Sequence, residues 1–262
     1  MLCSRCATHA TTDRSGHCAE CAAAPTGGPP TAWAPPPPVR PVRSVVGLSY
    51  AVVSLLAAVA VIDVFAVYAA LGVRAATGTM NVEAVEDHDR YAQALDQAEW
   101  LLYLSSSLGM MGVLATGIVF IIWFHRTRTN AEVFAPGTLR RGPGWAIASW
   151  FIPFANLWIP RWIAGDIWTA SELDRRVPRT VLNAWWILWV LMLPVSQIAG
   201  RMWERAEEAE AIRQATLALA ASSALDIAAA VLAILFVHRL TAMQETKTLA
   251  GPQPAPVMAP SF

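Results

Sequence analysis

Four cysteines near the amino end have the spacing of a metal site. They form two Cys-x2-Cys pairs separated by eleven residues: Cys3, Cys6, Cys18 and Cys21. Each pair places two thiolates in one tight turn, and four thiolates complete the tetrahedral shell that Zn²⁺ prefers. Two disulfides, a redox pair or spare thiols are the alternatives, but disulfides need an oxidising compartment and a redox pair needs a βαβ context. The spacing predicts one structural zinc ion in a ribbon-like module over residues 1–22.

Two acidic residues lie within long apolar runs. Asp63 is deep in the first run and Asp226 is in the last. A carboxylate in hydrocarbon costs several kcal/mol, so each is expected to face other helices, to be protonated or to meet a partner. One interpretation is a proton or cation site between helices, and the other is a pair of neutral acids that pack the bundle. The sequence leaves both open.

A tryptophan-rich stretch over residues 145–168 is the third candidate. It holds five of the twelve tryptophans together with prolines and charged residues. Asn156 lies between Pro153 and Pro160, so the backbone is expected to break there. Broken helices that enter a membrane can line a ligand path, whereas a kinked interfacial anchor is the simpler interpretation. The residues singled out are Trp145, Trp150, Pro153, Asn156, Pro160 and Asp166.

The rest of the chain indicates the elements that must position these groups. Of its 262 residues 55% are hydrophobic and 15% are charged, with a mean hydropathy of +0.42. A soluble domain carries about 25% charge, so a soluble enzyme is excluded. Apolar runs long enough to cross roughly 30 Å of hydrocarbon predict four transmembrane helices. The predicted spans are residues 45–73, 101–124, 181–199 and 216–237.

The distribution of basic residues predicts the topology. If the tryptophan-rich stretch does not cross, the cytoplasmic parts carry 14 basic residues and the outer loops carry 5. If it crosses, the ratio falls to 11 against 7. The positive-inside rule therefore favours four spans in the cell membrane, with both termini cytoplasmic. The amino end has no apolar core typical of a signal peptide, which agrees with a cytoplasmic start. The net charge is zero, so no nucleic-acid partner is expected.

Outside the spans, composition sets the domain limits. Residues 23–43 contain eight prolines and are expected to form a semi-rigid linker. The membrane domain is predicted over residues 44–245, and residues 246–262 are expected to be a disordered tail. Four arginines at the inner surface are expected to set topology or to bind anionic lipid headgroups. These are Arg126, Arg128, Arg140 and Arg141.

Small residues line one face of the second span. Ser105, Gly109, Gly112 and Thr116 follow each other at helical spacing. Such a stripe allows close helix packing, either within the chain or between copies in a homo-oligomer.

The centre of the chain resembles a known family. An arginine/asparagine segment over residues 125–130 is followed by Trp150-Phe-x-Pro153-x-x-Asn156-x-x-x-Pro160 and then by Asp166-Ile-Trp168. This pattern resembles the signature of the bacterial membrane family called domain of unknown function 4328, over roughly residues 45–245. The resemblance implies a multi-span membrane protein and supplies no activity, substrate or catalytic residue.

The fold class expected is an all-α integral membrane protein. It has four transmembrane helices and one tryptophan-rich interfacial or re-entrant segment, preceded by a small zinc ribbon. No nucleophile, base and orienting group can be grouped from the sequence, so the protein is not expected to be an enzyme. The leading hypothesis is a membrane scaffold or sensor whose ribbon contacts a cytoplasmic protein partner. The alternative is a small transporter or channel that uses Asp63, Asp226 and the break between Pro153 and Pro160.

Overall fold

The computed structural model describes residues 2, 3, 8, 10, 18, 41–78, 88–173 and 176–251. The chain divides into two compact units, Met1–Arg40 and Pro41–Phe262. In the first unit, Leu2 and Ala10 pair in an antiparallel β-bridge, and the side chains of Cys3 and Cys18 are buried. The other two predicted zinc ligands, Cys6 and Cys21, lie outside the described residues.

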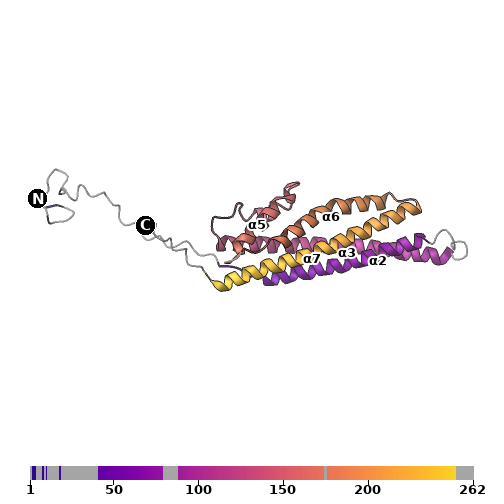
Figure 1. The fold of residues 1–262 in the computed structure, drawn as a ribbon, viewed down its shortest axis with the longest axis horizontal. Helices are drawn as coiled ribbons and strands as arrows, with labels where there is room; N and C mark the ends of the chain where they lie inside the picture. The colour runs from indigo at the N-terminus through magenta and orange to yellow at the C-terminus, as the bar shows by residue number, and fades with distance from the viewer. Residues whose placement is uncertain are drawn as a thin grey trace. The chain divides into compact units, whose positions relative to one another are not determined.

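Four long helices form the second unit (Figure 1). Each contains an apolar window long enough to cross a membrane, so the four predicted segments are confirmed as helices able to span it, and the protein is a multi-pass membrane protein. A hydrocarbon core of roughly 30 Å needs about 20 helical residues, so the helices also extend beyond it. They are α2 (Val46–Gly78), α3 (His88–Phe134), α6 (Thr180–Glu204) and α7 (Ala209–Ala250).

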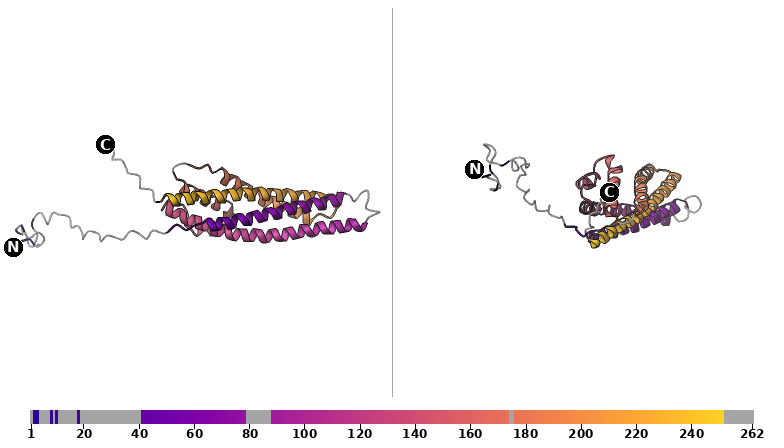
Figure 2. Two further views of the ribbon diagram at one scale, coloured as in Figure 1. Left: turned by 90° about the horizontal axis from the view of Figure 1, so that it is seen from below. Right: turned by 60° about the vertical axis from the view of Figure 1, so that its left-hand side comes forward.

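Helix α2 packs against both α3 and α7, and α6 packs against α7. The left view of Figure 2 shows α2 between its two neighbours. The small-residue stripe of α3 faces α2, because a Cβ atom built on Gly112 would lie 2.8 Å from Val59 Cγ2 and one on Gly109 would lie 3.8 Å from Ile62 Cγ2. The stripe therefore serves helix packing within the chain, as close approach of two helices requires small side chains.

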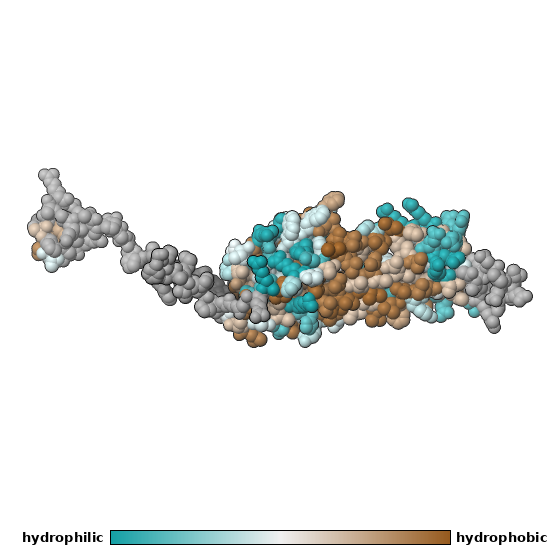
Figure 3. All heavy atoms as spheres, viewed as in Figure 1, coloured by the Kyte–Doolittle hydropathy of each residue, from teal (hydrophilic) through white to brown (hydrophobic). Residues whose placement is uncertain are grey.

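The outer surface of the bundle carries an apolar belt. Figure 3 shows hydrophobic side chains gathered around the middle of the helices and hydrophilic ones at both ends. Exposed large apolar side chains on α2 and α3 contribute to the belt, among them Phe65, Tyr68, Met110, Leu114 and Ile118. A surface of this kind is stable in contact with lipid rather than water.

One end of the bundle contains three short elements in addition to the ends of the four long helices. The carboxyl ends of α3 and α7 lie there beside the amino ends of α2 and α6, joined by hydrogen bonds and packing. Between α3 and α6 the chain forms three short elements at this end, namely α4 (Trp145–Ala148), the 3-10 turn η2 (Ala155–Leu157) and α5 (Ile159–Ser171). We call this end the polar end.

The predicted start of the disordered tail at residue 246 is wrong, because α7 continues to Ala250. The Nζ atom of Lys247 donates hydrogen bonds to the carbonyl oxygens of Ala170 and Glu172, at 2.8 and 2.7 Å. These carbonyls end α5 and have no partner within that helix, so Lys247 satisfies them and holds the last turn of α7 in place. Residues 252–262 lie outside the described residues.

Candidate functional site

A buried amide network joins four segments at the polar end. The side chain of Asn130 on α3 accepts a hydrogen bond from the backbone N–H of Arg43 at 3.0 Å and donates one to the Arg43 carbonyl at 2.8 Å. It also donates to Gln244 Oε1 on α7 at 3.2 Å. Gln244 Nε2 in turn donates to the Thr127 carbonyl at 3.0 Å and to Ser171 Oγ on α5 at 3.3 Å. One network therefore connects α3, α5, α7 and the segment that leads into α2.

The polar groups of the network lie on buried helix faces, as α7 shows. On α7, Val237, Leu240, Thr241 and Gln244 are all buried, and their spacing puts them on one helix face. Gln244 was not predicted from the sequence, although it follows the buried positions at the spacing of a core residue. A polar side chain at a core position needs partners of its own, and that is the signal that could have found it.

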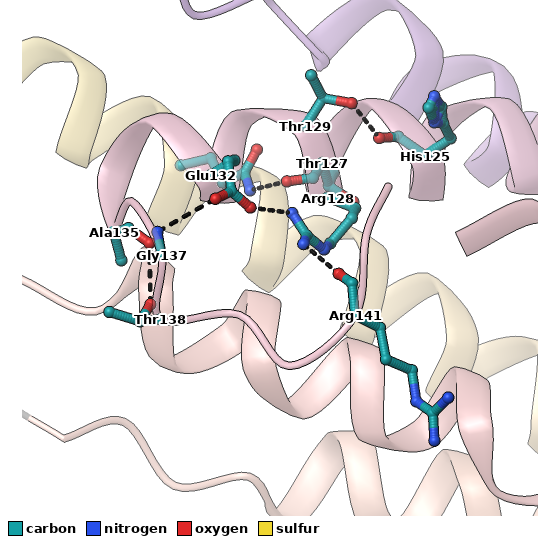
Figure 4. A network of polar contacts seen from close by, with 10 residues as sticks. His125, Thr127, Arg128, Thr129, Glu132, Ala135, Gly137, Thr138 and Arg141 are labelled. Atoms are coloured by element: carbon teal, nitrogen blue, oxygen red, sulfur yellow. Dashed lines mark hydrogen bonds and ion pairs between the residues drawn. The ribbon is translucent and has the colours of Figure 1, made fainter. Parts of the chain in front are cut away.

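A second network fixes the loop that follows α3 (Figure 4). The Arg128 side chain is only 2% exposed, and its Nη1 lies 2.8 Å from Glu132 Oε2. Its Nη2 donates to the carbonyl of Arg141, thirteen residues along the chain. Glu132 Oε1 also accepts from the backbone N–H of Gly137 at 3.2 Å. The expectation that Arg128 binds lipid headgroups is therefore wrong, since a buried guanidinium needs internal partners and Arg128 has them, whereas its expected part in setting the topology stays a prediction.

The predicted residue Trp150 lies at the centre of an aromatic cluster. Its ring makes edge contacts with two phenylalanines of α3 and two tryptophans of α6, with centroid distances of 5.6 to 6.1 Å. These partners are Phe120, Phe124, Trp186 and Trp189. Aromatic pairs in such geometry add stability beyond their buried area, so Trp150 ties the tryptophan-rich stretch to the bundle.

The predicted backbone break is present beyond Trp150. The chain passes through turns and the single turn η2 before α5 begins, and Pro160 occupies the first turn of α5. Phe154 adopts φ of +62°, which is uncommon for any residue other than glycine. Its side chain is 79% exposed, and Phe151 and Trp158 beside it are also exposed. Pro153 is exposed and Asn156 is half-buried within this break.

Of the remaining predicted residues of the stretch, Asp166 lines a cavity together with Arg140 and Arg141, and Trp145 contacts Arg141. Asp166 Oδ1 lies 3.7 Å from Arg140 Nε, and the guanidinium of Arg141 lies 5.1 Å from the ring centre of Trp145 and 5.8 Å from that of Trp162. The cavity has a volume of about 380 Å³. Cation–π contacts of this kind hold an arginine in place without a carboxylate.

The two intramembrane aspartates come together across the α2–α7 interface. Both side chains are half-buried, and Asp63 lies within electrostatic range of Asp226. Asp63 Oδ2 and Asp226 Oδ1 are buried and have no hydrogen-bond partner among the described residues. The structure thus brings together two groups that are 163 positions apart, which the sequence alone placed only in separate helices.

A metal centre is not evident within the part of the chain that the structure describes. No three His, Cys, Asp or Glu side chains are grouped there so as to hold an ion. The predicted zinc site needs Cys6 and Cys21, which fall outside that part, so this prediction remains untested.

The sequence of the segment that contains most of the polar end matches a known protein family. The family model described as "Domain of unknown function (DUF4328)" matches residues 86–242. The chain belongs to the DUF4328 family. The expected membership is confirmed, but the match begins at residue 86 rather than near 45. The matched region therefore includes α3, the tryptophan-rich stretch and α6, whereas α2 and Gln244 lie outside it. No curated protein and no solved structure matches the chain.

Proposed function

We propose that this DUF4328 protein is a non-enzymatic membrane scaffold or sensor whose N-terminal unit meets a cytoplasmic protein partner. The observation that carries the proposal is the pair of hydrogen bonds between Asn130 and the backbone of Arg43. Arg43 lies in the short segment between the N-terminal unit and α2. A bidentate contact fixes this segment in position and orientation, so a force on the linker acts directly on α3 and, through Gln244, on α7.

The packing of the polar end supports a mechanical role. The amides of Asn130 and Gln244 and the guanidinium of Arg128 are engaged in internal hydrogen bonds. The aromatic cluster around Trp150 fills the space between α3 and α6. Satisfied polar networks and dense aromatic packing make a site rigid, which suits a platform that transmits a force.

The proposal is tested by chemical crosslinking in intact cells followed by mass spectrometry. The full chain is compared with a chain that lacks residues 2–40 and with the Asn130→Ala variant. We expect the deletion to lose the specific crosslinked protein, and Asn130→Ala to retain it while changing the crosslinks within the bundle. Thr129→Ala is the matched control, because its hydroxyl bonds only within its own helix. A deletion variant that keeps every crosslinked protein would falsify the proposal.

The proposal includes a structural zinc ion in the N-terminal unit. It is supported by the spacing of Cys3, Cys6, Cys18 and Cys21, and the burial of Cys3 and Cys18 is compatible with it. Metal analysis of the purified full chain is expected to find one zinc ion per chain and none after Cys18→Ser. A full chain purified without chelators that contains no zinc would remove this part of the proposal.

A transporter or channel is the second candidate, favoured by the unpartnered oxygens of Asp63 and Asp226. Two acids within electrostatic range of each other in a low-dielectric region share a proton or bind a cation more readily than they stay doubly ionised. In liposomes with a pH-sensitive dye inside, a transporter would show a proton or cation flux that Asp63→Asn abolishes. Asp96→Asn is the matched control, because Asp96 is exposed near the start of α3. Absence of flux in the full chain for protons, sodium and potassium would rule against this candidate.

A further inference from the structure

Two arginines at the polar end converge above one glycine. Arg161 lies in the first turn of α5, and Arg179 directly precedes α6. A Cβ atom built on Gly165 would lie 3.1 Å from Arg161 Nη1 and 3.7 Å from Arg179 Nη1. Both guanidinium groups therefore approach the same point, and the missing side chain of Gly165 leaves room for them.

Each guanidinium is held in place by its other terminal nitrogen. Arg161 Nη2 donates to Asn183 Oδ1 on α6, and Arg179 Nη2 donates to Thr169 Oγ1 on α5. The Nη1 atoms on the shared side have no hydrogen-bond acceptor among the described residues. Two donors are thus fixed in orientation and directed at a common position.

The pair of positive charges lacks a counter-charge in the described part of the chain. Burial and the neighbouring charge of Arg179 lower the pKa of Arg161 below its ordinary value. The described acids of α5 and of its carboxyl end have other partners. Asp166 pairs with Arg140, and the Glu172 carboxylate accepts a hydrogen bond from the backbone N–H of Val177. An arginine pair brought together without a carboxylate is stabilised by a bound anion.

The position of the pair indicates where that anion comes from. The apolar helix α6 begins at Thr180, immediately after Arg179. Trp158 and Trp162, on either side of Arg161, are both exposed, and tryptophan concentrates at the level of the lipid headgroups. The two guanidinium groups are therefore expected at the depth of the lipid phosphates.

We propose that Arg161 and Arg179 form a binding site for the phosphate of an anionic phospholipid. One phosphate can accept from both Nη1 atoms, and the backbone N–H groups of the first turn of α6 add to the positive potential. Two cations that have no acidic partner among the described residues favour a headgroup with net negative charge over a zwitterionic one. Neither the scaffold role nor the transport role is required for this site.

The test is lipid binding to the detergent-solubilised full chain, measured by native mass spectrometry. Phosphatidylglycerol and phosphatidylcholine are titrated separately, and inorganic phosphate is added as a competitor. We expect phosphatidylglycerol to bind more tightly than phosphatidylcholine. Arg161→Gln and Arg179→Gln are each expected to weaken its binding about tenfold, as for the loss of one charge-assisted hydrogen bond. Thermal unfolding of each variant confirms that the bundle is intact.

Two further variants separate a defined site from general surface charge. Arg140→Gln removes the same charge from an exposed side chain at the same end and is expected to change binding less than twofold. Gly165→Val keeps every charge but fills the point where the guanidinium groups meet, so it is expected to weaken binding. Equal loss in Arg140→Gln and Arg161→Gln, equal binding of the two lipids, or displacement of the lipid by millimolar inorganic phosphate would each overturn the proposal.

Discussion

Substitution of Asn130 by alanine probes the contact on which the proposed function depends. It removes two hydrogen bonds to the Arg43 backbone and one to Gln244, and it leaves Gln244 Oε1 without its donor. At about 1 kcal/mol for each hydrogen bond, the segment before α2 loses about 2 kcal/mol of local stability with its two bonds to Asn130. The Arg43 backbone N–H has Asn130 Oδ1 as its acceptor. Its amide hydrogen is therefore expected to exchange with solvent roughly thirtyfold faster in Asn130→Ala.

Hydrogen–deuterium exchange of the full chain in lipid nanodiscs, read on peptides that cover residues 41–50, measures this effect. Asn130→Asp keeps the acceptor for the Arg43 N–H but loses both donated bonds, so most of the Arg43 protection is expected to remain. Thr129→Ala is expected to leave exchange unchanged, because its hydroxyl bonds to His125 of the same helix. If exchange at Arg43 is the same in Asn130→Ala and in the unmodified chain, the bidentate contact does not hold this segment and the reasoning fails.

Three further predictions concern the bundle. Gly112→Ala is expected to lower the free energy of unfolding by about 1–3 kcal/mol, because its Cβ would overlap a side chain of α2. Gly117→Ala, whose Cβ would have no atom within 4 Å, is expected to raise the free energy of unfolding by up to about 1 kcal/mol through helix propensity. Thermal unfolding measures both variants, and equal effects would contradict the packing. Arg128→Met is expected to lower the free energy of unfolding by about 2–4 kcal/mol, since it leaves Glu132 and the Arg141 carbonyl without their hydrogen-bond donor. An unchanged melting temperature would mean that this network is dispensable. In a background without the native cysteines, an impermeant thiol reagent is expected to label Glu207→Cys but not Thr138→Cys in intact cells, and the reverse pattern would invert the predicted topology.

The helical spans could be predicted because they depend on local chemistry. A run of about 20 apolar residues is stable in hydrocarbon only as a helix with its backbone hydrogen bonds closed, whatever its neighbours are. The break after Trp150 could be predicted from local chemistry as well, since Pro153 and Pro160 each lack a backbone N–H and disfavour one continuous helix through both. The end of α7 could not be predicted from composition, because residues 246–250 remain helical with Lys247 bonded to carbonyls of α5.

Hydropathy and the family resemblance were enough to predict a multi-pass membrane protein of the DUF4328 family, with four apolar helices able to span a membrane and a tryptophan-rich segment between the second and third of them. Which polar residues act together depends on how the helices pack. Asn130 and Gln244 are 114 positions apart, and Arg161 lies on α5 whereas Arg179 directly precedes α6. Hydropathy and spacing describe one element at a time, whereas a buried hydrogen bond depends on the relative position of two elements. That position follows from the packing of Gly112 against α2 and of Trp150 among the rings of α3 and α6.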